Sequence, residues 1–276
     1  MDIERISAFS VGEDGGNPAG VVIGDAHPEA TDMARIAAEV GYSETAFAAR
    51  MGEAWRVRYF APASEVPFCG HATIALGAAL GGRFGVGVYD LILNDARISV
   101  EAMAGARAAL TSPPTSQPEL DPALTTEARR IFGVADEDLH PDLPIARISA
   151  GADMLMIPLS SRARLARMEY DQAAGKALLD AHGIIGAYFV HQAEARRFDV
   201  RMAFPTGGVF EDPATGAAAA AFSGWLRDSG RLSGVIEIMQ GEDMGAPSRI
   251  TARSTPDIGA PIRVEGATRR IRCEPR

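Results

Sequence analysis

An internal repeat is the sequence feature that most constrains what this chain can fold into. Residues 58–62 form a strand-like segment with Phe and Pro at its end, and an acidic loop and a small-residue helix over 70–80 follow. The same order returns at residues 201–205 and in a small-residue helix over 216–226. Alanine-rich helices resemble one another by chance, but a shared order of strand, loop, glycine and helix argues against chance. We therefore expect two structurally related halves.

A proline-rich stretch at residues 112–122 separates the two halves. Prolines at this density disfavour both helices and interior strands, so we expect the domain boundary here, with a helix over 126–132 after it. The prediction is an N-terminal domain over 1–115, which the C-terminal strand could complete, and a C-terminal domain over 120–276. Strands and helices are mixed along the chain without the regular alternation of a parallel, doubly wound sheet.

Composition narrows the possible partners. The chain has 276 residues, of which 47% are hydrophobic and 23% charged, as in ordinary globular domains. A net charge of −9 argues against binding to a nucleic-acid backbone. No apolar run reaches the length of about 18 residues that indicates a membrane span, and the N-terminus does not resemble a signal peptide. We therefore expect a cytoplasmic protein that binds neither nucleic acids nor membranes.

Residues whose side chains can take part in catalysis or ligand binding gather where the two small-residue helices begin. Unpaired amides and the helix dipole make a helix N-terminus a natural site for an anion. If the two halves face each other, a small carboxylate could be bound between Gly70 and Gly216. Polar residues also stand just before or within each helix start: Glu65, Cys69 and His71 in the first half, and Glu211, Asp212 and Thr215 in the second.

Glu44, in an earlier loop, adds a carboxyl group. Burial and a neighbouring negative charge both raise a carboxyl pKa, and a group tuned in this way exchanges protons near neutral pH. Two such groups on opposite faces of a substrate carbon would form a proton shuttle or an epimerase. Structural roles stay open: Asp212 as a helix N-cap, Glu44 as a surface charge and His71 as a packed histidine.

Cys69 is open to two interpretations. It precedes a helix N-terminus, where a thiolate is stabilised, but a single cysteine is more often a small buried apolar residue. The chain has neither the His/Cys spacing of a metal site nor a dinucleotide-binding fingerprint. From these patterns we expect no metal site and no dinucleotide cofactor.

Six segments in one order carry a family resemblance that spans nearly the whole chain. They are GNPAGVV at 16–22, GYSETAF at 41–47, YFAPASEVPFCGHAT at 59–73, GVFEDPATG at 208–216, Gln240-Gly241 with Pro247-Ser248, and RVEG at 263–266. In this order and spacing, the sequence resembles the phenazine-biosynthesis PhzF-like family, which has the diaminopimelate-epimerase-like fold.

The resemblance implies an α+β fold with two similar domains, related by a pseudo-twofold axis. Each is a mostly antiparallel sheet or barrel around a central helix, and the active site lies in the cleft between them. It also implies a cofactor-independent isomerase, active as a homodimer, that moves a proton within a small carboxylate-bearing metabolite. By similarity, Glu44 is the proton shuttle, and His71 and Asp212 position the substrate or assist the transfer. The implied substrate-binding residues are Gly70, Thr215, Gly216 and Ala217.

Two alternatives accompany this reading. A thiol-assisted epimerase or racemase would use Cys69 as a catalytic residue, opposite Asp212. A non-catalytic relative would keep the small-molecule site without the reaction. The second alternative is favoured by Ala217, which stands where the family often has a serine, so that a hydroxyl contact to the ligand is missing.

Overall fold

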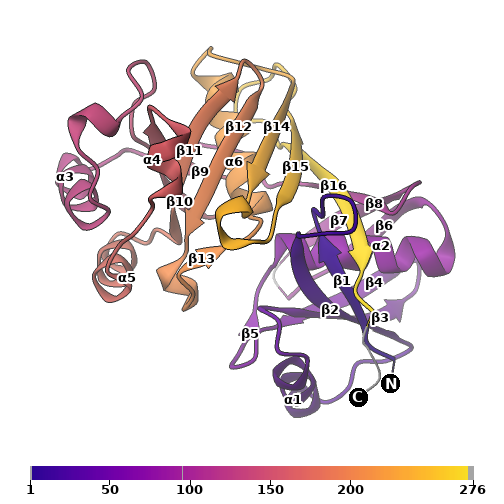
Figure 1. Cartoon of the computed structure of the whole chain (residues 1–276). Coiled ribbons are helices and arrows are strands. Elements are labelled where there is room, and N and C mark those ends of the chain that lie inside the picture. Colours follow the sequence, from indigo (N-terminus) through magenta and orange to yellow (C-terminus); the bar gives the residue numbers. More distant parts are fainter. Residues whose placement is uncertain (1, 95, 273–276) are drawn as a thin grey trace. The chain divides into compact units, whose positions relative to one another are not determined.

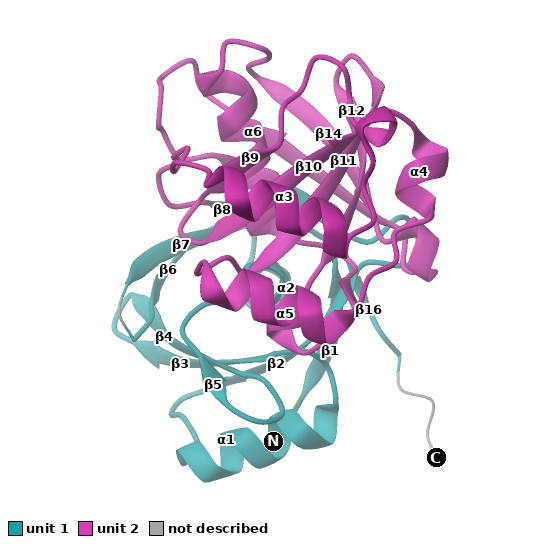
Figure 2. Cartoon of the chain, turned by 90° about the vertical axis from the view of Figure 1, so that its left-hand side faces the viewer, with its two compact units in different colours: residues 1–111, 265–276 teal, residues 112–264 magenta. Residues whose placement is uncertain are grey.

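The chain divides into two compact units in the computed structural model, which describes residues 2–94 and 96–272 (Figures 1 and 2). Unit 1 comprises residues 1–111 and 265–276, and unit 2 comprises residues 112–264. The division falls at the start of the proline-rich stretch. The amide of Ser112 donates to the carbonyl of Ile262 (2.8 Å), and that of Thr115 to Gly259 (3.0 Å), so the stretch is part of unit 2.

Unit 1 is a set of strands around one long helix. Its strands are β1 (Glu4–Ala8), β2 (Asn17–Gly24), β3 (Thr45–Met51), β4 (Ala54–Phe60), β5 (Glu65–Val66), β6 (Gly87–Ile92), β7 (Arg97–Met103), β8 (Arg107–Thr111) and most of β16 (Arg263–Arg270), and its helices are α1 (Ala30–Val40) and α2 (Gly70–Phe84). The strand order is β1-β2-β3-β4-β6-β7-β8-β16, and β16 pairs with β1. The strands therefore close into a barrel, which the C-terminal strand completes.

The small residues of α2 explain how a helix fits inside this barrel. A Cβ atom on Gly77 would lie 2.5 Å from Cγ2 of Val100, and one on Gly81 would lie 2.6 Å from Cβ of Ala102. Both neighbours belong to β7, so the helix backbone packs directly against that strand. Nearly every position from His71 to Leu80 is buried, as expected for a helix that is apolar on all sides.

Unit 2, like unit 1, consists of a sheet packed on a helix of small residues. Its strands are β9 (Ala146–Ser149), β10 (Asp153–Leu159), β11 (Gly186–Glu194), β12 (Arg197–Ala203), β13 (Glu211–Asp212), β14 (Val235–Gln240) and β15 (Ser248–Arg253), its helices are α3 (Pro122–Ile131), α4 (Arg162–Ala166), α5 (Gln172–Ala181) and α6 (Gly216–Asp228), and its short 3-10 turns are Asp136–Asp138, Pro205–Gly207 and Glu242–Met244. The strand order is β9-β10-β11-β12-β14-β15.

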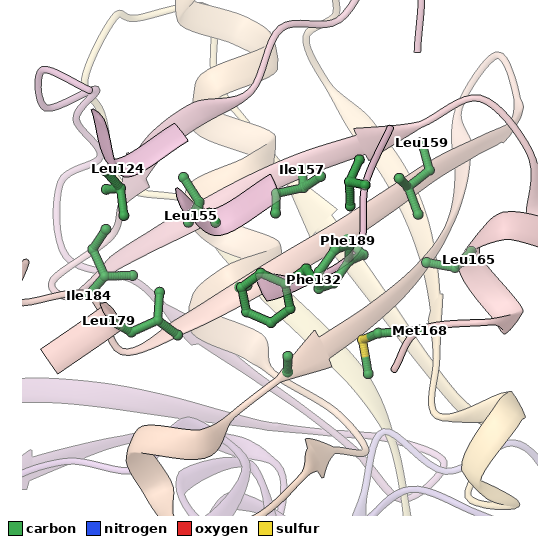
Figure 3. Packing of buried hydrophobic residues seen from close by; sticks show 14 residues of the cluster. Leu124, Phe132, Leu155, Ile157, Leu159, Leu165, Met168, Leu179, Ile184 and Phe189 are labelled. Atoms are coloured by element: carbon green, nitrogen blue, oxygen red, sulfur yellow. The ribbon is translucent and has the colours of Figure 1, made fainter. Parts of the chain in front are cut away.

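Both faces of the unit 2 sheet are covered. Phe189 of β11 meets Phe132, next to α3, in an edge-on ring contact at 5.3 Å (Figure 3). The neighbouring Tyr188 points to the other face and meets Phe222 of α6 at 6.1 Å. Because successive strand residues alternate between faces, α3 and α6 lie on opposite sides of this sheet.

The predicted repeat is present as a strand-strand-helix motif in each unit. In unit 1, β4 pairs antiparallel with the two-residue strand β5, and α2 follows. In unit 2, β12 pairs antiparallel with the two-residue strand β13, and α6 follows. Within the described residues, no helix has both the length and the apolar character needed to cross a membrane.

Candidate active site

The first half-site is formed where a loop meets the start of α2. Helix α1 ends at Gly41, whose φ of 73° is the left-handed conformation that suits glycine. Three residues later, the carbonyl of Glu44 accepts a hydrogen bond from the amide of Gly20 (3.1 Å). Thr45 then begins β3 and is fully buried. The hydrogen bond to β2 therefore fixes the backbone of Glu44, and with it the position from which the side chain extends.

His71, in the first turn of α2, meets the side chains of this loop. Its Nε2 lies 3.3 Å from Oε2 of Glu44 and 3.3 Å from Oγ of Ser43. The side chain of His71 is 8% exposed and that of Glu44 is 18% exposed. Oε2 of Glu44 is itself buried and makes no hydrogen bond to any described residue. This carboxylate oxygen is therefore shielded from solvent and lies close to the imidazole, but it is not hydrogen-bonded to it.

Cys69 is the N-cap residue of α2, and its side chain lies beside the same histidine. Its Sγ is 3.4 Å from Nδ1 of His71 and 3.9 Å from Nε2. The carbonyl of Cys69 accepts from the amide of Thr73 (3.0 Å) and from its hydroxyl (2.7 Å). The hydroxyl of Thr73 in turn bonds to that of Tyr59 (2.6 Å). The helix start is therefore anchored to β4, which fixes Cys69 and His71 in place.

Glu65 is held by an ion pair on the strand side of this half-site. Both of its carboxylate oxygens bond to the guanidinium of Arg58, at 2.8 and 2.6 Å. This pairing lowers the pKa of Glu65 to about 2. The residue is therefore a permanent anion that ties β5 to β4, and it does not belong among the proton-exchanging groups.

The second half-site lies at the start of α6 and is tightly bonded. The hydroxyl of Thr215 donates to Oδ2 of Asp212. Gln240, at the end of β14, donates to the carbonyl of Asp212 (2.7 Å) and to Oγ1 of Thr215 (3.0 Å), and accepts from the amide of Thr215 (3.1 Å). Thr215, and not Asp212, is the N-cap residue of α6. The structure therefore places Asp212 in a network just ahead of the helix.

Arg201 and Glu211 repeat the ion pair of unit 1 in unit 2. Two hydrogen bonds of 3.0 and 2.6 Å join them, and their side chains are 8% and 3% exposed. Arg201 lies on β12 and Glu211 on β13, the strands that correspond to β4 and β5. The pair therefore ties β13 to β12, and both oxygens of the Glu211 carboxylate are engaged by Arg201.

The sequence pattern assigns no role to two residues of the half-sites, Ser43 and Gln240. Gln240 stands in a segment that resembles the family, but nothing in its local pattern indicates its partners. The following residue, Gly241, has a φ of 76°, and a Cβ atom there would lie 2.3 Å from the carbonyl oxygen of Ala246 and 2.8 Å from that of Pro213. Only glycine fits, so the segment before α6 packs directly on this turn.

A cavity of about 320 Å³ lies elsewhere in unit 1, toward the C-terminal end of α2. Its lining includes Gly81 and Gly82 of α2, the turn between β7 and β8, and Thr268 of β16. None of Glu44, Cys69 and His71 contributes to it. We therefore identify the first half-site by its reactive side chains, and not by the presence of a cavity.

Comparison with known proteins places these residues in a family context. The family model described as phenazine biosynthesis-like protein matches residues 6–272. An isomerase of Deinococcus radiodurans, named as uncharacterized, is 32% identical over 89% of this chain and 84% of its own length. The trans-2,3-dihydro-3-hydroxyanthranilate isomerase of Pseudomonas chlororaphis is 30% identical over 94% of this chain and 92% of its own.

Solved structures support the fold. The crystal structure of a phenazine biosynthesis protein of the PhzF family from Bacillus anthracis superposes with a TM-score of 0.85. It shares 22% sequence identity and covers 99% of this chain and 98% of its own. The predicted α+β, diaminopimelate-epimerase-like fold is confirmed. With a family model that covers almost every residue and two isomerases related along most of their length, this chain belongs to the phenazine biosynthesis-like, or PhzF, family.

Proposed function

We propose that this protein is a cofactor-independent isomerase that moves a proton within a small carboxylate-bearing metabolite, with Glu44 as the residue that carries the proton. One observation supports this role most directly. Oε2 of Glu44 is buried, makes no hydrogen bond to a described residue, and lies 3.3 Å from Nε2 of His71. Membership of a family whose related proteins are named isomerases supports the reaction class.

The proposed division of labour follows from these contacts. An uncommitted carboxylate oxygen accepts a proton from a substrate carbon and returns it to a second position of the same molecule. His71 positions that carboxylate, because its imidazole is fixed by the first turn of α2 and by the contact with Ser43. The imidazole also supplies a hydrogen-bond donor or acceptor to the substrate, according to its tautomer.

The substrate carboxylate is proposed to bind at the helix starts. The first amides of α2 and α6, at Gly70 and Gly216, lack partners within their own helices, and the helix dipole favours an anion there. Asp212 would then orient the substrate, held in place by Thr215 and Gln240. Ala217 offers its amide but no hydroxyl, which favours a substrate that differs from those of relatives with serine there. The proposal requires both half-sites to serve one substrate.

A second candidate function is a thiol-assisted epimerase. It is favoured by the contact between Sγ of Cys69 and Nδ1 of His71 at 3.4 Å. In that reaction the imidazole would take the thiol proton, the resulting thiolate would remove a proton from the substrate carbon, and the carboxyl group of Asp212 would return a proton to the opposite face of that carbon.

Incorporation of solvent deuterium distinguishes the two candidates. Wild type, Glu44→Gln and Cys69→Ala would be incubated in deuterated water with a panel of small cyclic β-hydroxy and α-amino carboxylates, and exchange would be followed by NMR. Glu39→Gln is the matched control, because it makes the same chemical change at an exposed glutamate of α1. We expect Glu44→Gln to lower exchange by about 10²–10⁴-fold, with Cys69→Ala close to wild type.

Three results would count against this proposal. Full exchange in Glu44→Gln would remove its central residue, and loss of exchange in Cys69→Ala alone would favour the thiol reaction. Thermal stabilisation of the wild type by a panel carboxylate without any exchange would favour a binding protein.

A further inference from the structure

We propose that Glu44, Cys69 and His71 form a binding site for a thiophilic divalent cation, with Zn²⁺ as the type case, and that the cation blocks this half-site when bound. The proposal goes beyond the proposed isomerase function and does not require it. It rests on three different donor atoms, a carboxylate oxygen, a thiol sulfur and an imidazole nitrogen, that all lie within 4.8 Å of one another.

The chemistry of the donors selects the kind of cation. Mg²⁺ and Ca²⁺ prefer oxygen ligands only, and a thiolate together with an imidazole favours Zn²⁺ or a similar borderline-soft ion. A thiolate, a carboxylate and a neutral imidazole carry two negative charges in total. A bound dication therefore leaves the cluster neutral, which matters because both Cys69 and His71 are buried.

The spacing of the donors is close to what zinc needs. With ordinary zinc–ligand bonds and tetrahedral angles, neighbouring donor atoms lie roughly 3.3–3.7 Å apart. Nε2 of His71 is 3.3 Å from Oε2 of Glu44 and 3.9 Å from Sγ of Cys69. Sγ of Cys69 also lies 3.4 Å from Nδ1 of His71, so coordination of one ion through Nε2 requires the cysteine side chain to rotate away from Nδ1. The ion would also give the buried, unbonded Oε2 of Glu44 a partner.

The position of the site in the fold indicates a reversible ligand and not a permanent structural ion. Among the described residues, the cluster holds three His, Cys, Asp or Glu donors, one fewer than a four-ligand structural zinc site, so at least one coordination position stays open. The donors stand at the N-terminal end of α2, where the helix dipole stabilises a thiolate but opposes a cation. Because Glu44 and His71 become ligands, the bound ion would compete with any substrate for this half-site.

Metal binding itself is the test, and its readout does not depend on activity. Untagged protein, freed of metal by chelation, would be titrated with Zn²⁺ by calorimetry and with Co²⁺ by absorption, in which a thiolate ligand produces a charge-transfer band. The variants are Cys69→Ser and Glu44→Gln. Cys273→Ser is the matched control, because it makes the same chemical change at the only other cysteine of the sequence.

We expect one ion per chain and a thiolate band in the wild type and in Cys273→Ser. Cys69→Ser should lose the band and weaken Zn²⁺ binding by about a hundredfold or more, since even the loss of an outer partner of a ligand costs about 10–100-fold. Glu44→Gln should weaken binding and keep the band. Equal binding by wild type and Cys69→Ser, or no binding by either at millimolar Zn²⁺, would overturn the proposal.

The two proposals fail independently. Zn²⁺ binding by a protein that exchanges no substrate deuterium would leave this inference in place and count against the isomerase. Deuterium exchange by a protein that binds no Zn²⁺ would do the reverse.

Discussion

Nε2 of His71 lies 3.3 Å from Oε2 of Glu44, and this contact joins the loop before β3 to the first turn of α2. If the two side chains act as one unit, His71→Asn should lower deuterium exchange, and adding Glu44→Gln should lower it little further. Residues that act together in a reaction show such non-additive losses. His182→Asn, outside both half-sites, is the control. Independent, multiplying effects of the two variants would contradict the coupling.

Gln240 is expected to organise the second half-site. Its side chain is 1% exposed and makes three hydrogen bonds to Asp212 and Thr215. Gln240→Leu keeps the approximate volume but leaves those groups unpaired, at about 1–3 kcal/mol for each one that stays buried. Urea unfolding should show the loss, and exchange should fall with it. Gln117→Leu, at an exposed position, should show neither effect.

Glu65 should contribute an acid-dependent part of the stability. Because Arg58 lowers its pKa from 4.5 in the unfolded chain to about 2 in the fold, the unfolded state binds this proton first as the pH falls. The stabilisation is therefore present above pH 4.5 and is lost between about pH 4.5 and 2, with a slope of at most one proton.

Urea unfolding at several pH values across this window tests that expectation. Wild type should lose stability more steeply than Arg58→Met, in which the carboxyl has no guanidinium partner. Arg249→Met, which removes a longer, exposed pair with Glu237 at 3.6 Å, should follow the wild-type slope. Parallel slopes for wild type and Arg58→Met would show that the pair makes no acid-dependent contribution.

Two glycines of α2 should respond in opposite directions to alanine. At Gly77 the new Cβ would lie 2.5 Å from Val100, and such overpacking typically costs about 1–3 kcal/mol. At Gly82 the nearest atom is Nη2 at the end of the long Arg270 side chain, at 3.0 Å, and alanine in a helix is favoured by up to about 1 kcal/mol. Thermal unfolding should rank Gly82→Ala above Gly77→Ala, and the reverse order would contradict this packing.

Local patterns predicted the helices that carry the half-sites well. The repeat placed helix starts at Gly70 and Gly216, and both helices begin there. The helix predicted over 126–132 instead starts earlier, at Pro122, with Asp121 as its N-cap and its side chain bonded to the amide of Ala123. Proline fits the first turn of a helix, since no partner for its missing amide is needed there. The high proline content of residues 112–122 therefore led to a predicted helix start that is four residues too late.

The acidic residues near the helix starts show where local patterns fail. Glu65 and Glu211, like Asp212, are acidic residues just before the helix starts in the sequence. In the structure each is held by an arginine on the strand that precedes it, Arg58 and Arg201. Which carboxylate meets an arginine depends on strand pairing and register, and single residues do not encode that register.

The sequence by itself determined the family, the repeated halves and the helix starts, because these depend on motifs and short-range periodicity. Only the tertiary structure decided which polar groups meet. It brought Glu44, Cys69 and His71 within 4.8 Å of one another, and it committed Gln240 to Thr215 and Asp212. The first set of contacts forms because β2 holds the loop that contains Glu44 beside the start of α2. The second forms because Gln240, at the end of β14, lies beside the start of α6. Such side-chain contacts depend on packing between segments that are distant in the sequence, and local sequence patterns do not specify them.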